Sequence, residues 1–255
     1  MPRPLTPVPE IRGALRVHPL LNAREYGVDA FLTDRTGGVS RGPYNSLNLA
    51  AHVGDRLDHV IENRRRVAEA ARVAPEHLII VRQVHGCDLV DAANVRDDTC
   101  ADALYTERTD LALAILVADC LPVLLFDDTT SRIAVAHAGW RGLDAGVLAT
   151  AVAGFGDPRR VRAIIGPSIS GGAYQVGPEV AERFADVKGA LRVDGERHWR
   201  LDLRRVAEDQ LLTLGVGAEH LSATTLVSDG GGTFFSDRAQ RPCGRFALVA
   251  RRVLA

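Results

Sequence analysis

Three residues of this sequence have side chains suited to holding a metal ion, and each stands where an apolar run meets a turn. They are His85 in VRQVHG, Cys120 in VADCLP and His137 in VAHAGWRG. Neutral imidazole and thiolate bind zinc tightly, and three protein ligands leave a fourth tetrahedral position for water or substrate. The residue types therefore predict a catalytic metal site.

The spacing of these residues is weaker evidence than their types, because a single buried Cys or His is more often part of a packed core. Each of the three adjoins Gly, Pro or Asp in a turn, where packing demands are low and functional residues concentrate. We expect each to lie at or just beyond the C-terminal end of a strand. Such ends tend to converge, so ligands far apart in the sequence can meet in space.

The elements that must position these residues alternate between strand and helix along the chain. Short runs rich in branched residues predict strands over 77–84, 111–118, 121–126, 132–138, 161–166 and 244–254. Apolar spacing and turn residues predict helices over 58–73, 143–155, 178–185 and 202–214. Several of the strands are apolar throughout, which predicts that both of their faces are covered.

The sequence contains no Pro/Ser-rich linker that would divide it. We therefore expect one domain over residues 1–255, of the α+β class, with mixed β-sheets flanked by helices. The first residues, 1–12, contain prolines and charges and are expected to form a flexible lead-in.

Composition excludes several classes of protein. With 46% hydrophobic and 25% charged residues among 255, the chain is typical of a soluble globular protein with a sizeable core. Its formal net charge of -1 gives no overall attraction to nucleic acid or anionic lipid. It lacks a membrane-spanning apolar stretch and a signal-like N-terminal region, so a cytoplasmic location is expected. The four cysteines show no CxxC spacing, so reduced thiols are expected.

Longer motifs carry a resemblance to a known family. The strings TDRTGGVSRGPYNSLNLAAHVGD, VRQVHG, VADCLPVLLF, VAHAGWRGLDAGVL and IGPSISGGAYQVGPEV resemble the YfiH-like laccase-domain family, and they occur in the same order from about Phe31 to Arg245. The resemblance implies a YfiH-like fold and a zinc ion held by His85, Cys120 and His137. It also implies phosphorolysis of adenosine, inosine or methylthioadenosine to the base and ribose 1-phosphate, together with adenosine deaminase activity.

Purine nucleosides and phosphate are thus the expected partners, for a monomer or a homodimer. Phosphorolysis requires groups that bind anionic oxygen, a role expected of Arg35 and Arg141. Asn48 is expected to orient sugar or base. Polar residues within the matched motifs extend the expected substrate contacts to His52, Ser236 and Arg245. Each of these side chains also has an ordinary structural interpretation, as a turn cap or a solvated ion pair.

Two acidic positions raise further questions. Asp119, next to Cys120, is a candidate general acid/base for deamination, although a residue that caps local N–H groups in a turn would look the same. Asp237 in FFSDR stands where relatives commonly have an aromatic residue, as in FFSYRR. This exchange removes a stacking face that could hold a purine. Cys87 and Cys243 lie outside the metal motifs and are read as ordinary thiols.

Other functions use the same residues. A copper-dependent phenol oxidase is one alternative, but the chain has eight His, no H-x-H pair and only Met1, so copper would be an adventitious substitute for zinc. A metal-free cysteine hydrolase could use Cys120 as nucleophile, His137 or His85 as base and Asp119 as orienting group. A third alternative is that the chain is a non-catalytic regulatory protein. The preferred nucleoside, the choice of phosphate or water as acceptor, and the oligomeric state stay open.

Overall fold

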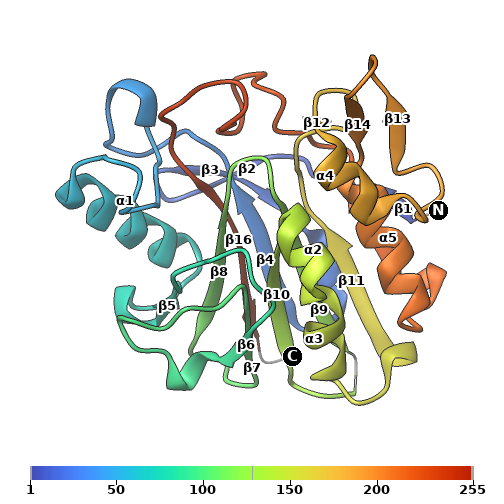
Figure 1. Cartoon of the computed structure of the whole chain (residues 1–255). Helices are drawn as coiled ribbons and strands as arrows, with labels where there is room; N and C mark the ends of the chain where they lie inside the picture. Colours follow the sequence, from blue (N-terminus) through green and yellow to red (C-terminus); the bar gives the residue numbers. More distant parts are fainter. Residues whose placement is uncertain (1, 128, 254–255) are drawn as a thin grey trace.

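Two β-sheets packed face to face form the centre of the molecule (Figure 1). The computed structural model describes residues 2–127 and 129–253. The seven-stranded sheet has the order β1 (Arg3–Leu5), β15 (Leu221–Thr224), β11 (Val161–Ile165), β9 (Leu121–Asp127), β10 (Ile133–Ala138), β7 (Ala103–Thr106) and β6 (Leu89–Asp91). The six-stranded sheet has the order β2 (Glu10–Arg12), β3 (Leu15–Pro19), β4 (Val28–Thr33), β16 (Phe246–Arg252), β8 (Ala112–Val117) and β5 (Leu78–Ile79).

The remaining elements lie outside these two sheets. A three-stranded sheet contains β12 (Gln175–Val176), β14 (Trp199–Leu201) and β13 (Leu191–Val193). The α-helices are α1 (Leu57–Ala70), α2 (Trp140–Ala145), α3 (Val147–Ala153), α4 (Pro178–Ala181) and α5 (Leu203–Thr213). Short 3-10 helices cover Leu21–Tyr26, Gly42–Tyr44, Pro75–His77, Ala92–Asn94, Pro158–Arg160, Glu182–Phe184 and Ala218–His220.

The helices cover the outer faces of the two sheets and so create four layers. Helix α1 packs on the six-stranded sheet, and α2 to α5 pack on the seven-stranded sheet, on the other side of the molecule (Figure 1). Alternate residues of each central strand point into the core between the sheets or into the core beneath the helices. Every residue of β8, β9 and β10 is consequently buried. This confirms the expected α+β domain and its doubly covered strands.

Two predicted helices differ from the structure in their continuity. The segment 143–155 was expected to be one helix, but α2 and α3 are separated at Gly146, which has φ +86°. A left-handed residue ends a helix, and glycine adopts that conformation without a steric penalty. The 178–185 segment is α4 followed by a 3-10 turn. The other two predictions are confirmed as α1 and α5, the latter capped by the Asp202 carboxylate, which accepts from the Arg205 N–H.

The predicted strand over 77–84 is mostly wrong. Only Leu78–Ile79 pairs with β8, and the chain then leaves the sheet with a single bridge between Arg82 and Cys100. The Gln83 side chain replaces the strand pairing: its Nε2 donates to the Leu116 carbonyl at 2.8 Å, and its Oε1 accepts from the Leu116 N–H at 2.8 Å. The following loop therefore stays attached to β8 while it turns towards the seven-stranded sheet.

The lead-in expected over residues 1–12 is also corrected, because this segment contains two paired strands. Strand β1 pairs in parallel with β15, and β2 pairs with β3 in an antiparallel hairpin. Their backbone groups hydrogen-bond in sheets, which a free lead-in would not do. Among residues 2–127 and 129–253, no helix has the length and apolar character needed to cross a membrane.

Candidate metal centre

The fold brings His85, Cys120 and His137 together. Their ligand atoms all lie within 4.8 Å of one another, and the two imidazole centroids are 4.8 Å apart. Cys120 lies in the tight turn between β8 and β9, and His137 lies next to last in β10. Because β9 and β10 are antiparallel with His137 opposite Pro122, the histidine is next to this turn. His85 comes from the loop after Gln83, so two of the three residues match the expected position at a strand end.

A buried carboxylate, Asp102, connects two of the three residues. Asp102 Oδ1 lies 2.8 Å from His137 Nδ1 and accepts from the His85 N–H at 2.9 Å. Asp102 Oδ2 accepts from the N–H groups of Val84 at 3.1 Å and Gly86 at 2.7 Å. Occupation of Nδ1 leaves Nε2 of His137 as the ring nitrogen that can bind a metal. A carboxylate behind a ligating histidine fixes its tautomer and orientation, which is the arrangement found at zinc sites.

Sequence analysis missed Asp102. The available signal was an acidic residue inside the small apolar run CADALY, where a fully buried charge needs a specific partner. Its partner, His137, becomes visible only from the pairing of β10 with β7, which places the His137 N–H 2.7 Å from the Asp102 carbonyl.

The side chains of the cluster polarise one another. Burial acts to raise the pKa of Cys120, but His137 and His85 together lower it to about 6. Burial acts to lower the pKa of His137, but the Cys120 thiolate and Asp102 raise it to about 9. Burial also opposes ionisation of Asp102, whose pKa is nevertheless lowered, mainly by its hydrogen bond to His137. Without metal, the cluster at neutral pH is therefore a thiolate beside an imidazolium, whose proton a metal cation can replace.

The surroundings of the cluster fit a metal ion. A Cβ atom at Gly139 would lie 2.8 Å from Cys120 Sγ and 3.3 Å from His85 Cδ2, so only glycine allows the backbone to approach the donors this closely. His137 is buried, Cys120 is half-buried and His85 is exposed, which opens the cluster on one side. Two imidazole nitrogens and one thiolate are the donor chemistry of zinc sites with an open position.

Backbone strain marks the same region. In the described part of the chain, three residues other than glycine have positive φ: Arg72, His85 at 62° and Asp119 at 82°. Left-handed backbone is unfavourable for such residues and occurs preferentially at functional sites. Of these three residues, His85 belongs to the metal cluster and Asp119 directly precedes Cys120.

The cluster opens into a pocket of about 440 Å³. The residues that line the pocket are His52, Gln83, His85, Leu116, Val117, Ala118, Asp119, Cys120, His137, Trp140, Arg141, Tyr174, Asp237, Arg238, Arg241 and Arg245. The structure therefore brings four further expected residues, His52, Asp119, Arg141 and Arg245, to the metal cluster. It does not place Arg35, Asn48 or Ser236 in the lining.

Arg35 and Ser236 instead support the loops around the pocket. The Arg35 Nε donates to the Asn45 carbonyl at 2.9 Å, and its guanidinium lies 4.7 Å from the centroid of the Phe235 ring. Ser236 Oγ accepts from the Ala239 N–H at 3.2 Å, which caps the turn that carries the arginines of the pocket. In these contacts both side chains support the loops around the pocket, and their expected contacts with substrate stay predictions.

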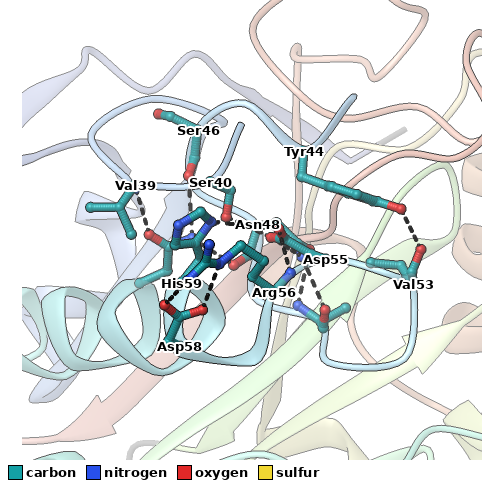
Figure 2. Close-up of polar contacts among 12 residues, drawn as sticks. Val39, Ser40, Tyr44, Ser46, Asn48, Val53, Asp55, Arg56, Asp58 and His59 are labelled. Carbon is teal, nitrogen blue, oxygen red and sulfur yellow. Dashed lines mark hydrogen bonds and ion pairs between the residues drawn. The ribbon is translucent and has the colours of Figure 1, made fainter. Parts of the chain in front are cut away.

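Asn48 is fully buried in a polar network (Figure 2). Its Nδ2 donates to the Asp55 carboxylate and to the Ala50 carbonyl, both at 3.0 Å, and its Oδ1 accepts from the N–H groups of Ala50 and Arg245 at 3.0 Å. Ser40 also donates to Asp55, at 2.6 Å. Asn48 therefore holds the backbone of Arg245, a residue of the pocket lining, and the expectation that it contacts sugar or base stays a prediction.

Asp119 lines the pocket but its carboxylate is engaged. Its Oδ1 accepts from Ser228 Oγ at 2.9 Å, and its Oδ2 accepts from the Arg238 N–H at 2.7 Å. The structure thus shows a capping role across a long sequence separation, in which Asp119 anchors the loop of residues 228–238 beside the metal cluster.

Two aromatic rings, of Trp140 and Tyr174, and two arginines, Arg238 and Arg241, also line the pocket and were not selected from the sequence. The Arg141 guanidinium lies 4.2 Å from the Trp140 ring centroid, and that of Arg238 lies 5.2 Å from the Tyr174 ring centroid. Burial and the nearby Cys120 thiolate raise the pKa of Tyr174 to about 12, so its phenol stays protonated. The pocket at the metal cluster therefore combines flat apolar faces with positive charge. Such a pocket suits a ligand that has both an aromatic ring and an anion.

Comparisons with known proteins point to one family and one fold. A family model described as multi-copper polyphenol oxidoreductase laccase matches residues 29–252. The purine nucleoside phosphorylase YfiH of Escherichia coli K12 is 39% identical over 231 residues, which cover 87% of this chain and 92% of that protein. A purine nucleoside phosphorylase of Pseudomonas aeruginosa is 40% identical over 228 residues, with the same coverage of 87% and 92%. The crystal structure of Bacillus licheniformis hypothetical protein YfiH superposes with a TM-score of 0.88 at 28% identity, covering 96% of this chain and 98% of that one.

Proposed function

The chain belongs to the laccase-domain family that includes the YfiH proteins, and we propose that it is a zinc-dependent purine nucleoside phosphorylase with adenosine deaminase activity. The observation that carries this proposal is the His85, Cys120 and His137 cluster on the wall of an arginine-lined pocket. Relatives that are 39% and 40% identical over most of the chain are named purine nucleoside phosphorylases, which supports the same substrate class.

Phosphorolysis breaks the bond from C1′ of the ribose to the purine nitrogen and forms a bond from C1′ to a phosphate oxygen. Phosphate must therefore be held beside the sugar by donors that tolerate its charge, and guanidinium groups do this well. Arg141 lines the pocket, stacks on Trp140 and makes no ion pair with the described residues, so its donors are available for phosphate. Arg245 is the second choice, because the pocket lining includes it and its backbone is fixed by Asn48.

His85, Cys120 and His137 would hold the zinc ion. Bound there, zinc would supply Lewis-acid chemistry, which stabilises negative charge on oxygen and makes water reactive near neutral pH. Asp102 keeps the His137 ring oriented and the His85 loop in place. Asp119 is less suited to moving a proton than its position suggests, since both of its oxygens already accept hydrogen bonds. We assign it to positioning the 228–238 loop.

Copper chemistry has weaker support, although the matching family model is named after it. Residues 2–127 and 129–253 contain one group of at least three His, Cys, Asp or Glu side chains that could hold a metal, whereas a multicopper oxidase needs several copper centres. Cu²⁺ can displace Zn²⁺ from nitrogen and sulfur ligands, so phenol oxidation would depend on the metal supplied.

A metal-free cysteine hydrolase is favoured by one observation, the Cys120 pKa of about 6 beside His137. A thiolate next to an imidazolium is a competent nucleophile. The two mechanisms differ in their response to metal removal: chelation abolishes the zinc activity, whereas it leaves or increases the activity of a free thiolate.

The decisive experiment incubates the zinc-loaded protein with adenosine, inosine and methylthioadenosine, each with and without phosphate. Phosphorolysis predicts free base and ribose 1-phosphate only when phosphate is present. Deamination predicts conversion of adenosine to inosine in both mixtures. Absence of ribose 1-phosphate from every mixture would contradict the phosphorylase proposal.

A matched pair of cysteine variants tests the metal. Cys120→Ala should lose both zinc and turnover, whereas Cys100→Ala removes an exposed thiol outside the pocket and should keep both. Metal content by mass spectrometry and product formation are measured on the same samples. Full activity of a zinc-free preparation would refute the metal mechanism.

A further inference from the structure

The pocket contains two kinds of arginine. Asp237 forms ion pairs with two of them: its Oδ2 lies 2.5 Å from Arg241 Nε, and its Oδ1 lies 3.0 Å from Arg245 Nη2. The guanidinium groups of the other two, Arg141 and Arg238, lie on aromatic rings and form no ion pair with a carboxylate within residues 2–127 and 129–253. Asp237 therefore neutralises part of the positive charge of Arg241 and Arg245, whereas the guanidinium groups of Arg141 and Arg238 keep their full charge.

Arg245 does not depend on Asp237 for its position. Its Nη1 donates to the carbonyls of Cys243 at 3.0 Å and Gly244 at 3.2 Å, and its backbone N–H donates to Asn48 Oδ1 at 3.0 Å. The Arg245 side chain is mostly buried, with 21% of its surface exposed. Loss of the Asp237 charge would therefore leave this guanidinium in the pocket with its Nη2 group released from the carboxylate.

Asp237 and an incoming phosphate require the same groups. Both are anions that take N–H donors from guanidinium, so the carboxylate competes with phosphate for Arg241 and Arg245. It also repels any phosphate that binds at Arg141 or Arg238, because like charges within one half-buried pocket are only partly screened. Asp237 lines the pocket with its side chain 26% exposed, which places its charge at the surface of the binding space.

We propose that Asp237 is a specificity-determining residue that weakens phosphate binding in this pocket and thereby sets the phosphate concentration at which the enzyme works. This inference rests on the proposed phosphorylase function for its biological meaning. The binding effect itself is a property of the charges in the pocket.

The test replaces the carboxylate by its neutral isostere, Asp237→Asn, in the zinc-loaded full-length chain. Two quantities are measured: the KM for inorganic phosphate at saturating inosine, and the Kd for inorganic phosphate by calorimetry without nucleoside. Both should fall about tenfold, as expected for removal of one like charge at an intermediate effective dielectric constant. The KM for phosphate should change more than kcat, since the charge acts on binding.

Asp110→Asn is the matched control. Asp110 forms an ion pair with Arg108 at 2.5 Å, as Asp237 does with Arg241, but it is exposed and lies outside the pocket lining. This variant should leave both phosphate constants at their wild-type values. Asp237→Ser, which removes the charge with a smaller side chain, should shift both constants in the same direction as Asp237→Asn.

The outcomes separate the inference from the proposed function. If the wild-type protein makes no ribose 1-phosphate, the proposed function fails, and the calorimetric Kd still tests Asp237. An unchanged or weaker phosphate Kd in both Asp237 variants overturns the inference, even where phosphorolysis is intact. An equal shift in Asp110→Asn also overturns it, because the effect would then reflect net charge.

Discussion

Asp102→Asn should separate metal binding from the rest of the fold more sharply than a change to a ligand. The Asp102 carboxylate accepts three backbone N–H bonds, at 2.7 to 3.1 Å, and lies 2.8 Å from His137 Nδ1. Asparagine has one acceptor oxygen, and its NH₂ group would face N–H donors. The amide oxygen replaces only one of the two carboxylate oxygens, so at least one backbone contact and the negative charge beside His137 are lost, on a side chain that is fully buried.

Two magnitudes follow from these contacts. Hydrogen bonds to a charged group contribute about 1.5–3 kcal/mol each, and removal of one partner of a buried charged pair costs about 3–5 kcal/mol. We therefore expect the free energy of unfolding of Asp102→Asn to fall by about 3–5 kcal/mol. Loss of a carboxylate behind a ligating histidine lowers metal affinity by about 10- to 100-fold. The zinc Kd should rise by that factor, because His137 loses its orientation and the His85 loop loses its anchor.

The assay pairs a zinc titration against a competing chelator with urea unfolding of the zinc-free protein. Asp127→Asn is the control, because Asp127 is also a buried carboxylate that accepts several bonds, from Thr129 and Thr130, but it lies outside the pocket. It should lose stability and keep the wild-type zinc Kd. A wild-type zinc Kd in Asp102→Asn would refute the assignment of Asp102 as the residue that positions the ligands.

Three further expectations concern single contacts. Gly139→Ala should cost about 1–3 kcal/mol of stability and weaken zinc binding in a chelator titration, since its Cβ would lie 2.8 Å from Cys120 Sγ; an unchanged zinc Kd would contradict this. In zinc-free protein, alkylation of Cys120 should accelerate as pH rises through about 6, because the lowered pKa makes the thiolate the main form above that pH. His137→Ala should move the midpoint of this pH profile upwards. A midpoint that this variant leaves unchanged would argue against the pairing of Cys120 with His137. Asn48→Ala should lower the free energy of unfolding, measured by urea denaturation, by about 2–4 kcal/mol, because four hydrogen bonds of a buried side chain are lost. A variant of wild-type stability with only a raised nucleoside KM would instead indicate direct substrate contact.

Element types along the chain were predictable because they depend on local pattern. The apolar runs at 111–118, 121–126 and 132–138 became β8, β9 and β10, and their lack of alternation correctly indicated cover on both faces. The run at 77–84 looked the same but formed only a two-residue strand. Its outcome depended on the Gln83 side chain bonding to Leu116, a contact between residues far apart in the sequence.

The site was predictable in part for the same reason. His85, Cys120 and His137 are distinguished by chemistry that only a few residue types possess, so type and turn context were sufficient to select them. Arg35, Asn48 and Ser236 have side chains that serve structure and binding equally well. Their motifs could not show that burial and local hydrogen bonds would direct them to loops that support the pocket.

The sequence by itself determined the donor set, the class of fold and the positions of most strands and helices, because these depend on residue chemistry and on periodicity over a few neighbours. Tertiary structure alone decided which residues surround the donors. Asp102 stands behind His137 through the pairing of β7 with β10, and Asp237 reaches Arg245 through the packing of one loop. Strand register and loop packing are set by contacts between distant parts of the chain, and local sequence does not specify those contacts.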